Sequence, residues 1–222
     1  MTSDPEKYLD KLILSENGNR AVADLVGDSA WGQLISPAPD ENPGKKHEGV
    51  RIVLFASYYY GYLLAEIIKC MERENPGRIN LVGLVTDDPA SPHAKISVKR
   101  RIWRFYDEHE TVNLESAMVE SALRDGVPVY TGAVRTKYFR DILKKWAPDV
   151  IITCVFGQII DKPIIDAPPM GIYNFHPADL AHHHGAGPQP FQDLIDRNAQ
   201  TTRATIHQLT VDLDAGPILG QS

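Results

Sequence analysis

Two residues that can stabilise a developing negative charge lie two positions apart, at Asn174 and His176. The surrounding segment, Gly171–Leu180, reads as a short apolar strand whose polar end stops at Pro177. Because residues two apart on a strand point to the same side, both side chains should project together where the strand opens into a loop. An amide donor beside an imidazole can hold a carbonyl oxygen that is gaining negative charge. The spacing alone leaves open the simpler interpretation that both residues only form a turn.

A carboxylate that can complete such a site follows in segment 210–217, which contains Asp212 and Asp214. A carboxylate near His176 favours the protonated, oriented imidazole, and it can take a proton from an attacking group directly or through water. Between the two stretches, the glycine-rich loop 182–188 is predicted to fold back over the site. A capped turn before a strand is the alternative interpretation of the aspartates.

From residue 50 onward, apolar strand patterns alternate with amphipathic helix patterns. We expect strands at 50–57, 79–85, 127–130, 149–155, 171–176 and 202–209, and helices at 63–71, 114–123, 134–146 and 188–196. Continuous apolar runs such as 50–57 are typical of parallel strands that are covered on both faces. The sequence therefore predicts an α/β fold with a Rossmann-like, mainly parallel twisted sheet flanked by helices.

Residues 1–49 have a different pattern. Asp4-Pro5 followed by apolar residues from Tyr8 to Leu14 predicts a short amphipathic helix that ends at Asn17-Gly18-Asn19. A proline-rich linker follows at 36–46. We therefore divide the chain into an N-terminal helical extension and linker at 1–49 and a main domain at 50–222. Packing on the core, covering the site and forming an oligomer contact are all open for this extension.

At its polar stretches the sequence resembles the folate-dependent formyltransferases. Asn174–Pro177 matches the active-site strand of that family, and Asp214–Ile218 matches its later Asp-x-Gly-Pro/Asp-Ile segment. His184–Pro188 resembles the Arg-Gly-Ala-Ala-Pro segment of the tRNA formyltransferase branch. The resemblance runs from about Arg51 to the last residue. It implies a formyltransferase catalytic domain at 50–222 whose C-terminal part is short or truncated.

The resemblance also implies roles for individual residues. Asn174, His176 and Asp214 are the implied catalytic residues. The implied folate contacts are Phe156, Gly157, Gln158, Ile160 and Asp212, and the implied acceptor contacts are Tyr58, Tyr59, Tyr60 and Gly187. In the purine branch of the family the turn that holds a substrate phosphate is glycine-rich, so three tyrosines there disfavour glycinamide ribonucleotide and favour an acceptor that stacks on aromatic faces. Packing of the tyrosines under a neighbouring loop is the alternative.

The resemblance implies transfer of a formyl group from N10-formyltetrahydrofolate to a primary amine of a sugar nucleotide, an aminoacyl-tRNA or a similar acceptor, without a metal. The same residues can serve hydrolysis of the formylfolate, so a deformylase remains open, as does a non-catalytic folate-binding protein. The histidines at 176 and 182–184 raise a zinc site as a further alternative, although consecutive histidines converge poorly on one ion. A nicotinamide dehydrogenase is disfavoured because no Gly-x-Gly-x-x-Gly follows the first strand of the α/β pattern.

Composition narrows the possible partners and compartments. The chain has 222 residues, 43% hydrophobic and 23% charged, which is typical of a soluble globular protein. Its net charge of −6 disfavours tRNA and other nucleic acids, and we interpret the basic run 95–104 as a solvated helix face. The sequence has no bilayer-spanning apolar run and no signal pattern, and Cys70 and Cys154 are predicted to be buried free thiols. We therefore expect a cytoplasmic protein.

Overall fold

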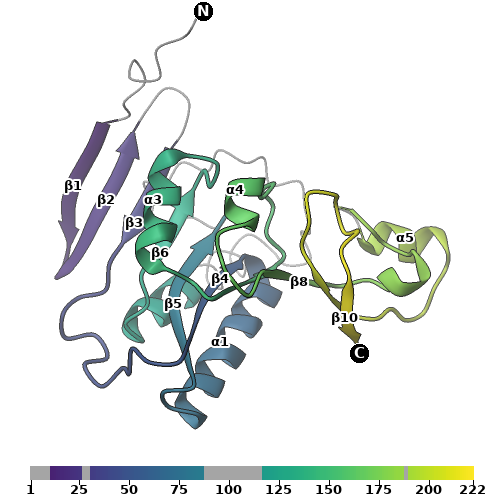
Figure 1. The fold of residues 1–222 in the computed structure, drawn as a ribbon, viewed down its shortest axis with the longest axis horizontal. Coiled ribbons are helices and arrows are strands. Elements are labelled where there is room, and N and C mark those ends of the chain that lie inside the picture. Colours follow the sequence, from purple (N-terminus) through teal and green to yellow (C-terminus); the bar gives the residue numbers. More distant parts are fainter. Residues whose placement is uncertain (1–10, 27–30, 88–116, 188–189) are drawn as a thin grey trace, which may run out of the picture.

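A computed structural model of the chain describes residues 11–26, 31–87, 117–187 and 190–222, apart from the side chains of Lys11 and Tyr58. Across these residues, ten strands form one sheet in the order β1-β2-β3-β6-β5-β4-β7-β8-β9-β10 (Figure 1). The strands are β1 (Lys11–Asn17), β2 (Arg20–Val26), β3 (Trp31–Ile35), β4 (Val50–Ala56), β5 (Ile79–Thr86), β6 (Val129–Gly132), β7 (Val150–Cys154), β8 (Ile172–His176), β9 (Thr205–Gln208) and β10 (Ile218–Gln221). The helices are α1 (Tyr58–Glu74), α3 (Lys137–Trp146), α4 (Lys162–Ile165), α5 (Pro190–Asp196) and the short η2 (Leu180–His182), and residues 117–124 are also helical.

The centre of the sheet is the predicted α/β unit. Strands β6, β5, β4, β7 and β8 all run parallel, joined by helices in between. The middle strand β4 is an apolar run in which Val53, Leu54 and Phe55 are fully buried, as a strand covered on both faces requires. The connections leave β4 and β7 in opposite directions along the sheet, so the carboxyl ends of these two strands form the switch point where α/β sheets bind ligands.

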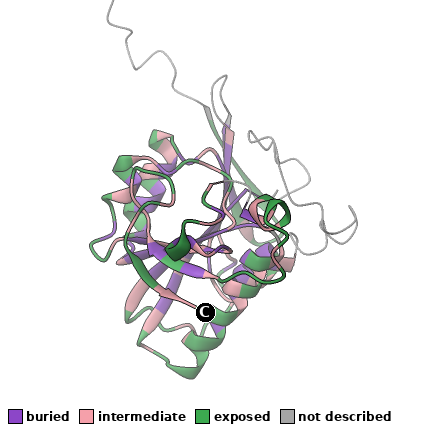
Figure 2. Cartoon of the chain, turned by 90° about the vertical axis from the view of Figure 1, so that its right-hand side faces the viewer, coloured by how far each residue is buried: buried purple, intermediate pink, exposed green. Residues whose placement is uncertain are grey.

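Helices cover both faces of this central sheet. Helix α1 and residues 117–124 pack on one face, and α3 and α4 pack on the other. Figure 2 shows the buried residues gathered on the strands and on the inward sides of the helices. Helix α3 buries Phe139, Ile142, Leu143 and Trp146 on a single side, which is the amphipathic pattern that the sequence predicted.

The predicted N-terminal helix is wrong. Residues 11–26 instead form the antiparallel hairpin β1–β2, and β2 pairs with β3. The two-residue connection Gly18-Asn19 makes the hairpin possible, because Gly18 takes φ +65 without strain. Strand β3 then pairs with β6, so the hairpin extends the sheet beyond its parallel part (Figure 1). Pairing with a distant strand overrode the local helical pattern.

The prediction of a mainly parallel sheet is also wrong for the sheet as a whole. Among the described strands, five of the nine neighbouring pairs are antiparallel and four are parallel. The antiparallel pairs lie at the two flanks: β1, β2, β3 and β6 pair in this way on one side, and β8, β9 and β10 on the other.

Two smaller expectations need correction. Cys154 is buried as predicted, but Cys70 is exposed on α1, and both thiols are free. The three tyrosines predicted in a turn form the first residues of α1, directly after its N-terminal flanking residue Ser57. The basic run 95–104 lies outside the described residues. In the part of the chain that is described, no helix combines the length and apolar character that crossing a membrane requires.

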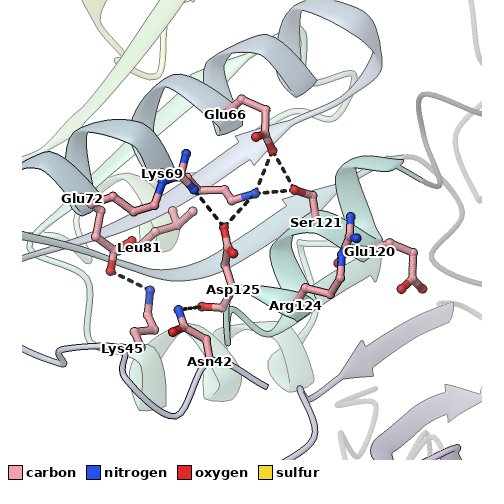
Figure 3. Close-up of polar contacts among 11 residues, drawn as sticks. Asn42, Lys45, Glu66, Lys69, Glu72, Leu81, Glu120, Ser121, Arg124 and Asp125 are labelled. Atoms are coloured by element: carbon pink, nitrogen blue, oxygen red, sulfur yellow. Dashed lines mark hydrogen bonds and ion pairs between the residues drawn. The ribbon is translucent and has the colours of Figure 1, made fainter. Parts of the chain in front are cut away.

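A buried lysine joins α1 to the end of helix 117–124 (Figure 3). Lys69 is 3% exposed, and its Nζ lies 2.8 Å from Glu66 Oε1 and 2.9 Å from Asp125 Oδ2. It also donates to Ser121 Oγ, which in turn donates to Glu66 Oε1 at 2.8 Å. The ammonium group thus has its three donors satisfied by two segments that are far apart in sequence.

We expect Lys69→Ala to lower the free energy of unfolding by about 2–3 kcal/mol, because it leaves two carboxylates facing each other beside a void. The figure lies below the range for fully buried pairs because both carboxylates are about one-third exposed. Urea unfolding measures the change. Lys137→Ala, which removes an exposed ion pair with Asp141, is the control and should change the free energy by less than about 0.5 kcal/mol. Equal effects of the two substitutions would contradict the structural role of Lys69.

Candidate functional site

The candidate site is built on strand β8, which lies between the parallel strand β7 and the antiparallel strand β9. The register places Asn174 directly opposite Thr153 on β7 and opposite His207 on β9. Residues opposite one another in a sheet share a face, so these three side chains form a row across the sheet. His176 follows two residues later on β8, at the end of the strand.

Asn174 is held from both sides. Thr153 Oγ1 donates to Asn174 Oδ1 at 2.7 Å, and Asn174 Nδ2 lies 3.2 Å from His207 Nε2. Thr153 is 2% exposed and His207 is 1% exposed, whereas Asn174 is only partly buried. The amide is therefore anchored on buried groups and keeps one side toward the surface.

His176 is buried, and each of its ring nitrogens faces an acceptor. Nε2 lies 2.7 Å from the carbonyl oxygen of Gly185, and Nδ1 lies 3.9 Å from Asp214 Oδ1. A carbonyl oxygen only accepts, so Nε2 carries a hydrogen and donates it. Gly185 has φ +64, and a Cβ at this position would lie 2.7 Å from the Cβ of Ala178. The close approach of loop 182–187 to His176 therefore requires glycine at 185.

Asp214 is brought to the imidazoles by the loop between β9 and β10. Its side chain is 7% exposed, and Oδ1 lies 3.5 Å from His207 Nε2. Gly187 N donates to Asp214 Oδ2 at 2.7 Å, and Asp214 itself has φ +51. Burial opposes the charge of this carboxylate, but His207 and His176 in their protonated forms and the Gly187 N–H together hold the pKa of Asp214 below its usual value. Asp214 is therefore a carboxylate between two imidazoles at neutral pH.

The loop after β7 reaches the same edge of the sheet. Val155 has φ +51, a strained conformation for a β-branched residue and one typical of functional loops. The Asp87 carboxylate at the end of β5 accepts from Gly157 N at 2.5 Å and from Gln158 Nε2 at 2.7 Å. Gln158 also donates to Gly132 O and accepts from Val134 N, so the polar atoms of its side chain are used in hydrogen bonds within the protein.

The other predicted contact residues lie in different environments. Phe156 is partly buried and packs edge-on against Phe55, with ring centroids 5.1 Å apart. Ile160 is buried in the core, and Asp212 is exposed in loop 209–217. Phe156 and the backbone of Gly157 are therefore accessible enough to contact a ligand, whereas Ile160 packs in the core.

The predicted acceptor contacts divide between the helix and the loop. Tyr60 is 48% exposed on the first turn of α1, and Tyr59 packs edge-on against it with ring centroids 5.7 Å apart. The side chain of Tyr58 lies outside the described residues, and Gly187 contacts Asp214 as described above. Ala56, which ends β4, is level with Cys154 and Phe175 in the register, so α1 begins beside the ends of β7 and β8.

The sequence interpretation missed Thr153, His207 and Asp87 as parts of this site. His207 occupies an inward position of a predicted alternating strand, but periodicity does not say which residue on the next strand it faces. The four histidines considered as a zinc site are not brought together. Outside the gaps at 1–10, 27–30, 88–116 and 188–189, the structure contains no group of three histidine, cysteine or acidic side chains that could hold a metal ion.

Comparison with known proteins identifies the family of the chain. The model of the formyl transferase family matches residues 50–222. A methionyl-tRNA formyltransferase of Thermotoga neapolitana is 28% identical over 155 residues, covering 69% of this chain and 43% of the relative. A second one, from Thermotoga sp. strain RQ2, is 34% identical over 86 residues, covering 39% of this chain and 27% of the relative. The chain thus spans less than half the length of these curated relatives.

Solved structures show the same fold. A phosphoribosylglycinamide formyltransferase of Bacillus halodurans matches with a TM-score of 0.54 and 22% identity, covering 78% of each chain. A formyltetrahydrofolate deformylase of Pseudomonas syringae matches with a TM-score of 0.55 and 19% identity, covering 79% of this chain and 51% of the other. At such identities the likeness concerns the fold, and it accords with the α/β prediction.

The lowered pKa of Asp214 predicts a pH-dependent contribution to stability. A carboxyl group with a lowered pKa in the folded state stabilises the protein above its unfolded pKa, and this stabilisation is lost as the pH falls through the folded value. Asp214→Asn, which tolerates positive φ, should therefore reduce the free energy of unfolding more at pH 6 than at pH 3.5. Urea unfolding at both pH values measures this, with the exposed Asp141→Asn as the matched control. A destabilisation of equal size at both pH values would contradict the assignment.

Proposed function

Because the chain belongs to the formyl transferase family, we propose that it transfers a formyl group from N10-formyltetrahydrofolate to a primary amine. The observation that carries the proposal is the position of Asp214 Oδ1, 3.9 Å from His176 Nδ1 and 3.5 Å from His207 Nε2, beside the anchored amide of Asn174. An amide donor, an imidazole and a carboxylate are the groups that acyl transfer to an amine needs. They meet here from two separate segments of the chain.

Asn174 and His176 supply the donors. Asn174 Nδ2 has a second hydrogen that makes no hydrogen bond with the described residues, and this hydrogen can meet a substrate oxygen. The Nε2–H of His176 is aimed at the Gly185 carbonyl, so a substrate oxygen that takes the place of this carbonyl receives the same hydrogen bond. Two donors fixed before the reaction stabilise negative charge without reorganisation.

Asp214 supplies the base. Its lowered pKa keeps it ionised at neutral pH, so it can accept the proton that the attacking amine loses, directly or through water. Asp214 Oδ1, 3.9 Å from Nδ1, also faces the other ring nitrogen of His176 and helps to keep the ring turned so that Nε2 donates.

The formyl donor fits the edge of the sheet at the switch point. When bound, it supplies the formyl carbon to which the amine adds. The ends of β4 and β7 offer the partly buried ring of Phe156 and the exposed backbone of Gly157, which suit a flat heterocycle with hydrogen-bonding edges. Asp87 accepts the N–H of Gly157 and thereby holds this exposed part of the loop in place.

For the acceptor, we propose an amine attached to a group that stacks on the exposed ring of Tyr60. The relatives above are methionyl-tRNA formyltransferases, which makes a tRNA acceptor plausible for this chain as well. The net charge of −6 favours a smaller acceptor such as a sugar nucleotide. A soluble enzyme of the cytoplasm is part of the same proposal.

Asn174→Ala, His176→Ala and Asp214→Asn should each lower turnover about a hundredfold or more, because each removes a group that acts in the transition state. The measurement is formyl transfer from N10-formyltetrahydrofolate to a panel of amines that includes a sugar nucleotide and methionyl-tRNA. His47→Ala, at an exposed histidine in the segment before β4, is the matched control and should keep full turnover.

The same assay without an amine separates transfer from hydrolysis. If formate is released at the same rate with each amine as without any amine, the protein is a hydrolase and the proposal of formyl transfer is wrong. Turnover of His176→Ala within threefold of wild type would reject the proposed role of the imidazole.

A further inference from the structure

The row of side chains Thr153, Asn174 and His207 suggests a specific division of labour. We propose that Thr153 and His207 are positioning residues that fix the orientation of the Asn174 amide, so that its nitrogen rather than its oxygen faces the reacting group. The proposal deepens the function above and rests on the role given there to Asn174.

The hydrogen-bond partners of His207 define its tautomer. Nδ1 lies 3.1 Å from the carbonyl oxygen of Gln208, which only accepts, so Nδ1 carries a hydrogen. In the neutral ring Nε2 is then bare, and it accepts a hydrogen from Asn174 Nδ2 at 3.2 Å. The Gln208 carbonyl on β9 therefore fixes the tautomer of His207, and this tautomer favours the nitrogen end of the Asn174 amide on the side of β9.

Thr153 contacts the other end of the amide, and because a hydroxyl can donate or accept, it holds the orientation that His207 selects. Its hydroxyl donates to Asn174 Oδ1 at 2.7 Å, so the oxygen end of the amide points to β7. Thr153 is 2% exposed near the carboxyl end of the buried strand β7, where valine would fill the same space. Among its described neighbours, Asn174 is the hydrogen-bond partner of this hydroxyl. Without this bond the buried hydroxyl would be unsatisfied and would destabilise the fold.

The reversed amide leaves groups unsatisfied. It would turn Oδ1 toward the bare Nε2 of His207, placing two acceptors against each other. The opposite tautomer of His207 would relieve this contact, but it would place a bare Nδ1 against the Gln208 carbonyl. A doubly protonated ring would donate from Nε2, which has Asp214 Oδ1 at 3.5 Å as a second acceptor. With a neutral His207, only the observed orientation satisfies Thr153, Asn174 and the ring together.

The orientation matters because an amide has two unlike ends. In the observed orientation the second hydrogen of Nδ2 is available to an oxygen that gains negative charge. In the reversed orientation a lone pair of Oδ1 would meet that oxygen and repel it. Fixing the amide therefore acts on the transition state more than on ground-state binding, and its loss should lower kcat more than it raises KM.

The first test uses the nearly isosteric pair Thr153→Val and Thr153→Ser. We expect Thr153→Val to lower kcat for formyl transfer about tenfold with KM changed less than threefold, and Thr153→Ser, which keeps the hydroxyl, to stay within about twofold of wild type. In an Asn174→Ala background, Thr153→Val should cause no further loss, because its effect passes through the amide. A kcat for Thr153→Val within twofold of wild type, or losses that multiply with Asn174→Ala, would overturn the proposal.

A second test measures the orientation of the Asn174 amide by NMR and does not depend on enzymatic activity. Nitrogen-15 NMR of the imidazoles at pH 8 should show His207 with a protonated Nδ1 and a bare Nε2, and the Asn174 amide signals should shift in Thr153→Val. A protonated Nε2 at that pH, or amide signals that do not shift, would overturn the proposal. If wild type transfers no formyl group to any amine, the proposed function fails, while this measurement still decides the orientation.

His207 provides an independent variant. His207→Gln can place an amide oxygen where Nε2 lies, whereas His207→Leu fills the space without an acceptor. We expect His207→Leu to lower kcat about tenfold and His207→Gln to recover most of it, with thermal unfolding confirming that both variants fold. Equal kcat for the two variants would overturn the part assigned to His207.

Discussion

The site depends on the register of β8 between two strands of opposite direction. A shift of one residue would turn Asn174 and His176 to the other face of the sheet and separate both from their partners. Ile172 opposes such a shift, because it is 1% exposed and packs in the same core as Phe139 and Trp146 on α3. The packing of one apolar residue at the start of the strand therefore fixes the polar chemistry at its end.

The parts of the fold that follow from local pattern were predictable, and those that follow from distant pairing were not. The apolar runs of β4 and β7 and the one-sided apolar pattern of α3 are sufficient by themselves to predict these elements, and the structure has them where the sequence predicted them. Residues Leu12 to Leu14 form an apolar run that fits a helix or a strand equally well. Their strand conformation follows from the chain of pairing from β1 through β2 and β3 to β6, which no local pattern contains.

The candidate site divides in the same way. The two-residue spacing of Asn174 and His176 predicted a shared face, and the structure has both at the end of β8. The distance between His176 and Asp214 depends on loop 209–217, where Asp214 takes φ +51 and Gly216 passes so close to Gln208 that a Cβ would lie 1.8 Å from its carbonyl oxygen. Thr153 and His207 could not be identified, because alternation shows which residues point inward but not which residues meet.

The hydrogen bond from His176 to Gly185 explains how such a site can be both stable and reactive. An imidazole donor with 7% exposure would be costly to leave without an acceptor, and the Gly185 carbonyl satisfies it. A substrate oxygen that replaces this carbonyl keeps the donor satisfied, so the exchange costs mainly the contacts that hold loop 182–187 in place. One of those contacts is the bond from Gly187 N to Asp214, the residue proposed as the base. In the proposed mechanism, movement of this loop would therefore release the donor and the carboxylate together, and access of the substrate oxygen would be coupled to the availability of the base.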